Sequence, residues 1–190
     1  MQTDAAKIVT AWHIERWDGD QTDWTKARTG LDTPSAANFH ALGVLPYDVS
    51  RVEGNLITTA GLTRITALLT AAGGQGVIAT STRLGTGNGA GTAVVGDTDL
   101  GAAAGSTNRW YQIMDSTYPQ VSAGVLTVKS TFASADGNYA WNEFAIDVGA
   151  PTVASSATVG ALLLNHKTSI AQGTKASGQT WAATATLTLS

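Results

Sequence analysis

The stretch Gln179-Thr-Trp-Ala-Ala-Thr-Ala-Thr-Leu-Thr-Leu189 decides the class of fold. Its apolar residues recur at every second position, namely Trp181, Ala183, Ala185, Leu187 and Leu189. Threonine fills positions 184, 186 and 188 between them. A period of two places alternate side chains on opposite faces of a β-strand, and β-branched threonine packs well on a pleated surface. The pattern predicts a strand over residues 179–189 with one buried face.

Similar segments occur throughout the chain upstream of this strand. Val125–Phe132 alternates in the same way, and the turn signal Ala135-Asp-Gly-Asn138 follows it. This order predicts a hairpin in which residues 139–148 form the partner strand. Residues 77–84 and 161–165 are further strand candidates. Several strands without intervening helices indicate a mainly β fold, an antiparallel β-sandwich of jelly-roll-like form.

One segment has a helical period instead. In Thr59–Ala72, residues Leu62, Ile65, Leu68 and Leu69 recur at the spacing of one helical face. Thr58 or Thr59 can cap its start, and Gly73-Gly74 ends it. The sequence therefore predicts one short α-helix that covers the sandwich with one face.

The first 53 residues differ from the rest. Lys7–Trp17 has the alternation of a strand, and Asp18-Gly-Asp20 then interrupts it as a turn. Residues 21–50 show no sustained period and leave room for one short helix near residues 35–42. We expect residues 1–53 to form an extended N-terminal arm used in assembly, and residues 54–190 to form the β-sandwich domain.

Composition excludes several classes of protein. The 190 residues are 43% hydrophobic and only 13% charged, with a net charge of -3 and no cysteine. No apolar run reaches the ~18 residues of a membrane-spanning helix, and no secretory signal is visible, so no membrane partner is expected. The mild acidity argues against nucleic acid as a partner. Without cysteine there are no disulfides and no thiolate ligands for a metal.

Motifs for catalysis and cofactor binding are incomplete. The loop Gly85–Gly91 reads G-x-G-x-G-x-G, which fits neither the dinucleotide fingerprint nor a phosphate-binding loop, because Ala90 holds the sixth position and no lysine follows. His13, His40 and His166 lack metal-ligand spacing, and the aspartates at 18–23 do not complete a calcium loop. We therefore expect no enzymatic activity, no catalytic residues, no metal site and no cofactor.

Aromatic residues are the remaining candidates for a binding role. Large rings concentrate the energy of protein interfaces, so the N-terminal segment supplies candidate subunit-interface anchors: Trp12, Ile14, Trp17, Trp24 and Phe39. Four further rings could stack on a glycan: Trp110, Tyr111, Tyr139 and Trp141. The same four rings could instead fill the sandwich core. Exposure decides between these alternatives, because stacking on a sugar requires an accessible ring face.

Several segments resemble a known family. Asn55-Leu-Ile-Thr-Thr-Ala-Gly-Leu62 leads into the predicted helix, and Leu84–Thr92 and Asp97-Thr-Asp-Leu100 follow in order. Later come Arg109–Pro119, Ala140-Trp-Asn-Glu-Phe144, Leu164-Asn-His-Lys167 and Gly173-Thr-Lys-Ala176. This succession, over residues 54–190, resembles virion structural proteins of tailed bacteriophages, of the tail-fibre-like, minor structural or capsid decoration type. The resemblance implies a small β-sandwich built into a phage particle and implies no catalytic residues.

The sequence thus favours a non-enzymatic virion protein. We expect a head-associated subunit, a capsid decoration or minor capsid protein, that binds the major capsid protein or other virion subunits through its arm and sandwich edges. Closed symmetry makes a homo-oligomer such as a trimer the expected form. The alternative is a tail-fibre or baseplate protein that binds a receptor or glycan. In both cases the expected location is the virion, assembled in the host cytoplasm.

Overall fold

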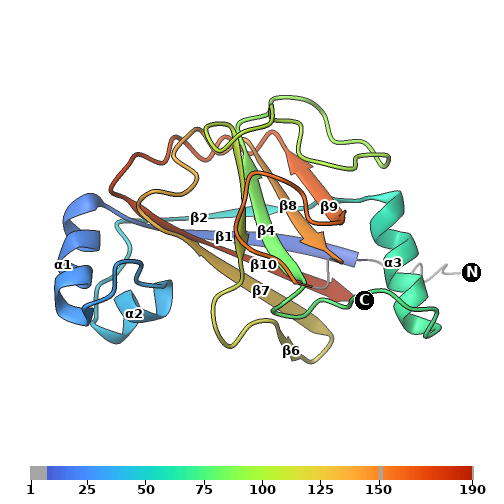
Figure 1. The fold of residues 1–190 in the computed structure, drawn as a ribbon, viewed down its shortest axis with the longest axis horizontal. Helices are drawn as coiled ribbons and strands as arrows, with labels where there is room; N and C mark the ends of the chain where they lie inside the picture. The colour runs from blue at the N-terminus through green and yellow to red at the C-terminus, as the bar shows by residue number, and fades with distance from the viewer. Residues whose placement is uncertain (1–7, 150–151, 190) are drawn as a thin grey trace, which may run out of the picture.

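Two antiparallel five-stranded sheets face each other in the computed structural model, which describes residues 8–149 and 152–189 (Figure 1). Sheet A has the strand order β2-β1-β10-β7-β6, with bounds Asp48–Glu53, Ile8–Trp17, Thr180–Leu189, Val125–Phe132 and Gln120–Ser122. Sheet B has the order β3-β9-β8-β4-β5, with bounds Leu56–Ile57, Leu162–Thr168, Glu143–Val148, Thr82–Gly87 and Arg109–Ile113. The predicted mainly β, antiparallel sandwich is confirmed.

Strand β10 has the predicted alternation. Trp181, Ala183, Ala185 and Leu187 are buried, whereas the threonines between them are partly exposed. The strand lies inside sheet A, where it pairs with β7 on one side and with β1 on the other. Pairing with β1 runs over the full strand, from Ile8 opposite Leu189 to Trp17 opposite Thr180. Because the apolar stripe has a strict period of two, this register buries it from Trp181 to Leu187, whereas Leu189, which was also expected to face inward, is 60% exposed at the end of the strand.

The extended N-terminal arm predicted for residues 1–53 is not confirmed. Within the described part of this segment, β1 lies between β2 and β10, and Trp12 and Ile14 are completely buried between the two sheets. The alternation that suggested a strand places these side chains on the core face, so residues 8–53 belong to the sandwich. Residues 1–7 lie outside the described residues.

Three helices flank the sheets in the described residues: α1 (Gly19–Thr29), α2 (Ala36–Ala41) and α3 (Thr59–Leu69). Helix α2 is the short helix expected near residues 35–42, whereas α1 was not expected. Helices α1 and α2 lie at one end of the molecule and α3 lies at the other (Figure 1). Asp18 begins α1 through a capping box with Gln21, so the turn expected there is a helix start. The buried residues of α1 are Thr22 and Thr25, which explains why no apolar period revealed the helix.

Two further predictions were wrong. β7 and the strand after it do not form a hairpin, because β7 lies in sheet A and β8 lies in sheet B. The expected flexible loop at Gly85–Thr92 begins inside β4, which β5 and β8 flank. A Cβ at Gly85 would lie 2.6 Å from Cε1 of Tyr111, so glycine here permits close packing of a ring against the strand.

Aromatic rings fill the core between the sheets. The Trp141 ring meets Phe132, Phe144 and Trp181 edge-on, at centroid distances of 4.7, 5.8 and 4.9 Å. Trp12 stacks on Phe144 at 4.9 Å. Edge-on and offset stacked pairs add to the stability that area burial provides. No helix among the described residues has the length and hydrophobicity needed to cross a membrane.

Candidate functional site

Burial removes most of the proposed interface anchors from the surface. Trp12, Ile14, Trp17 and Phe39 have no exposed area. Trp17 stacks on Phe39 at 4.6 Å and donates its indole N–H to the carbonyl of Val44, which attaches the α2 region to sheet A. These four side chains cannot contact a partner unless the fold opens. Trp24, 45% exposed on α1, is the one proposed anchor that a neighbouring molecule can reach.

The candidate glycan-stacking rings are likewise occupied within the fold. Tyr111, Tyr139 and Trp141 are buried. The Tyr111 hydroxyl contacts Asp99, and the Tyr139 hydroxyl donates to the carbonyl of Thr86 at 2.9 Å. Trp110 is half-buried, with its indole N–H donating to Gln112 at 2.8 Å. The four rings therefore present no common flat surface, and the core interpretation accounts for them.

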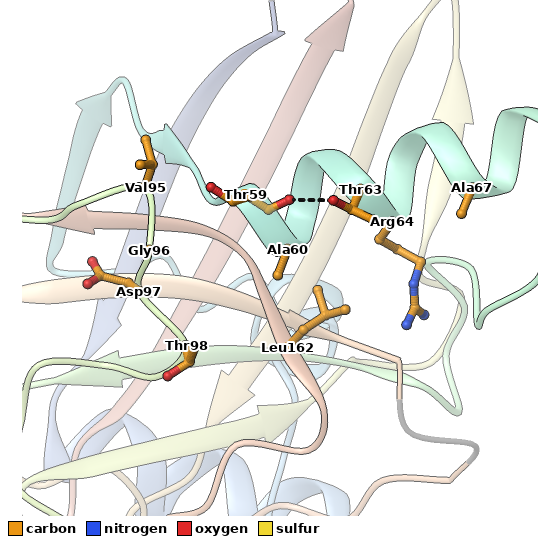
Figure 2. A pocket seen from close by; sticks show the side chains of 10 residues that line it. All are labelled: Thr59, Ala60, Thr63, Arg64, Ala67, Val95, Gly96, Asp97, Thr98 and Leu162. Atoms are coloured by element: carbon orange, nitrogen blue, oxygen red, sulfur yellow. Dashed lines mark hydrogen bonds between the residues drawn. The ribbon is translucent and has the colours of Figure 1, made fainter.

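A hollow on the described surface lies beside α3. It is a cleft of about 460 Å³ between the helix, residues 95–98 and Leu162 of β9. Figure 2 shows its lining: Thr59, Ala60, Thr63, Arg64, Ala67, Val95, Gly96, Asp97, Thr98 and Leu162. Short apolar and hydroxyl side chains dominate this wall. Arg64, the one cation in the lining, donates to the carbonyl of Gln75 at 2.8 Å.

Exposed apolar side chains lie on the flank of α3 that faces away from this cleft and in the segment that forms the other wall of the cleft. Helix α3 packs closely on the sandwich at Gly61, where a Cβ would lie 2.1 Å from the carbonyl oxygen of Leu164. Its outer flank presents Leu62, 54% exposed, and Leu69, 82% exposed. Across the cleft, Val94 and Val95 are also exposed. We call Leu62, Leu69, Val94, Val95 and the cleft the α3 surface.

The opposite end of the molecule carries a second set of exposed apolar residues. They lie on and after helices α1 and α2: Trp24, Leu31, Leu42, Leu45 and Tyr47. Apolar patches of this kind on a small protein mark contact sites for other proteins. The fold thus presents apolar surface at both of its ends.

A buried charged network supports the loops next to the cleft. Asp97 from the cleft lies with Oδ2 2.6 Å from Nδ1 of His166, and Nε2 of His166 lies 2.9 Å from Oε2 of Glu143. Glu143 is completely buried and also accepts the backbone N–H groups of Gly89, Gly101 and Ala102, at 3.2, 2.8 and 2.8 Å. One carboxylate thus fixes the glycine-rich segment and the chain after the cleft.

The network shifts the pKa values of its members in opposite directions. Burial alone would raise the pKa of Glu143, but the hydrogen bonds from His166 and the backbone outweigh it and leave the pKa below its ordinary value. Burial alone would lower the pKa of His166, yet the two carboxylates raise it above its ordinary value. The folded protein therefore favours an imidazolium between two carboxylates.

The contacts of His166 favour a structural role for the network. Both ring nitrogens of His166 are occupied by carboxylates on opposite sides, which leaves neither free to activate a nucleophile. His40 lies instead against Glu15 at 2.7 Å, a carboxylate that also binds Lys129. Among the residues described, no group of three or more acidic or histidine side chains is placed to hold a metal ion. The sequence could not show this network, since its members lie 23 and 69 positions apart.

Comparison with known proteins gives no relative. No family model matches the chain. Neither the curated proteins nor the solved structures include a match.

Proposed function

We propose that this chain is a non-enzymatic structural subunit of a tailed-bacteriophage virion, attached to its neighbours through the apolar surfaces at its two ends. The observation that carries the proposal is the exposure of Leu62 and Leu69 on α3, together with Leu45 and Tyr47 at the opposite end. The resemblance of the motifs over residues 54–190 to those of phage virion proteins supports the same proposal.

The surfaces can supply the required affinity. Burial of apolar area contributes about 25 cal/mol per Å², and a specific interface buries ~1,000 Å² or more. Many copies on one particle add avidity without stronger individual contacts. The anchors are then the exposed residues of the two ends, in place of the buried tryptophans of β1.

Within the particle we propose a head-associated position against the major capsid protein, as a homo-oligomeric decoration or minor capsid subunit. No tandem repeat of the kind that builds a fibre shaft occurs within the 190 residues. The burial of Tyr111, Tyr139 and Trp141 leaves a receptor-binding tail protein without its expected stacking rings. This favours the head over the tail fibre or baseplate.

The test uses phage particles that carry variant chains. Leu62→Ser/Leu69→Ser changes the α3 surface, and Val121→Ser is the control because Val121 is 76% exposed on β6, away from α3. The copy number per particle, measured by quantitative mass spectrometry, should fall at least about tenfold for the double variant if the interface loses about 1.4 kcal/mol or more. The control should match the wild type.

Imaging of labelled chain on intact particles tests the position. Label spread over the head shell supports the proposal, whereas label confined to the tail would replace it with the tail-fibre or baseplate function. Absence of the chain from purified particles would contradict the virion assignment. Normal incorporation of the double variant would contradict the role of the α3 surface.

A further inference from the structure

A lysine is completely buried in the segment that leads into β10. Nζ of Lys175 donates to the carbonyl oxygen of Ala133 at 2.8 Å and to Oδ1 of Asn138 at 2.7 Å. The backbone fixes this arrangement, because the N–H of Lys175 donates to the carbonyl of Tyr139 at 3.1 Å. Asp136 acts on the amine through its charge without a hydrogen bond.

Few negative charges offset the burial of this amine. Burial lowers the pKa of Lys175 to about 7, and the charge of Asp136 offsets only part of that effect. At neutral pH a large fraction of the side chain is therefore the neutral amine, whose lone pair makes it a nucleophile. A lysine on the surface would be almost entirely protonated at the same pH.

The neighbouring carboxamide is within reach of this nucleophile. A nitrogen 2.7 Å from Oδ1 lies about 3–4 Å from Cγ of Asn138, given a C=O bond of about 1.23 Å and ordinary acceptor angles. Reacting atoms in a near-attack arrangement lie about 3–3.5 Å apart. The N–H₂ group of Asn138 donates to the carbonyl of Ser134 at 3.0 Å, which restricts rotation of the carboxamide.

The surroundings limit access of water to the pair. Gly137, next to Asn138, is buried against the rings of Phe132 and Trp141, and its carbonyl accepts the indole N–H of Trp141 at 2.9 Å. Gly137 has φ +65°, a conformation that glycine adopts without strain, so the turn is held in one shape. The amine itself is screened from water because Lys175 is completely buried, whereas Asn138 is partly exposed.

We propose that Lys175 and Asn138 form an intramolecular isopeptide bond. The Nζ lone pair attacks Cγ of Asn138, and the resulting tetrahedral carbon then loses its original amide nitrogen. One C–N bond forms and one breaks, so the reaction needs no oxidant or reductant. A proton moves from Nζ to the departing nitrogen, which leaves as ammonia. The product closes a loop between residues 37 positions apart.

Intact mass spectrometry of the purified full-length chain tests the proposal directly. Loss of one ammonia lowers the mass by about 17 Da relative to the sequence. Tandem mass spectrometry of a protease digest should then show a branched peptide that joins Lys175 to Asn138. Lys175→Arg and Asn138→Ala should each restore the full mass.

Asn88→Ala is the matched control. Asn88 precedes Gly89, and an Asn-Gly pair can lose ammonia by forming a succinimide, so this variant separates that reaction from the cross-link. The Asn88→Ala protein should keep the loss of about 17 Da. A wild-type chain of full sequence mass would overturn the proposal. So would a mass loss that persists in Lys175→Arg, because it would come from another asparagine.

Discussion

His166→Gln tests whether the buried network of Asp97, His166 and Glu143 stabilises the fold. Glutamine has one donor group, so it cannot replace a charged ring that contacts carboxylates on both sides. Glu143 is completely buried and would lose the one cationic partner it has among the described residues. Removing one partner of a buried ion pair costs about 3–5 kcal/mol. We expect the free energy of unfolding, measured by urea denaturation at neutral pH, to fall by that amount.

His40→Gln is the matched control. His40 contacts Glu15 at 2.7 Å, the same type of pair, but its side chain is 42% exposed, and Glu15 also keeps Lys129 as a partner. An exposed pair of this kind contributes about 0–1 kcal/mol. The two variants therefore remove the same chemical group from a buried and from an exposed site. Equal losses of stability in both would refute the role assigned to burial.

The pH dependence gives an independent test of the same network. The pKa of His166 is raised on folding, so its contribution is complete below its ordinary value of 6.5 and is lost as the pH rises through the folded value. The pKa of Glu143 is lowered, so its contribution is present above its ordinary value of 4.5 and is lost as the pH falls through the folded value. The stability difference between wild type and His166→Gln should be greatest between 4.5 and 6.5 and should shrink at alkaline pH. A difference that does not change with pH would contradict the protonated form of His166.

Four further variants have defined outcomes in the same urea assay. Trp12→Ala should lower the free energy of unfolding by about 3–5 kcal/mol because the ring is fully buried. Trp24→Ala, at an exposed ring, should lower it by less than about 1 kcal/mol. Equal losses in the two variants would contradict the assignment of Trp12 to the core. Gly85→Ala should cost about 1–3 kcal/mol, because its Cβ would overlap the Tyr111 ring; a neutral effect would contradict the close packing at that strand. Lys175→Met cannot form the proposed bond, so its free energy of unfolding should fall by about 4 kcal/mol, the chain-entropy value for closing a 37-residue loop. An unchanged urea midpoint would contradict the cross-link.

Local patterns predicted the strands better than their partners. The alternation in β10 and β7 is a property of neighbouring residues, so the sequence alone shows it. Pairing is a property of distant residues, and nothing in residues 133–142 reveals that the chain crosses from sheet A to sheet B instead of turning back. Helix α1 was not predicted for a different reason. Its buried residues are Thr22 and Thr25, so its sequence has no apolar residues at helical spacing.

The candidate site was less predictable than the fold. Tryptophan content alone cannot distinguish a core ring from an interface ring. Trp12 is a core ring because β1 lies between β2 and β10, which the sequence does not show. The exposure of Leu62 and Leu69 has the same origin: the helical spacing is correct, but Gly61, Ile65 and Leu68 define the side that packs on the sandwich. A pattern of apolar residues therefore predicts a helix without stating which of its flanks stays exposed.

The distribution of charge in the fold bears on why the surface suits assembly. Only 13% of the residues are charged. Several of them are buried, where they bind distant parts of the chain through hydrogen bonds: Arg16, Arg83, Glu143, Asp147 and Lys175. Arg83, for example, binds Asp147 and the carbonyls of Ala154 and Thr158, which ties the segment after β8 to sheet B. Each charge used in this way is absent from the surface, where charged residues keep a protein soluble and monomeric. A chain that places several of its scarce charges inside and several of its leucines outside agrees with the proposal that neighbouring subunits cover its surface.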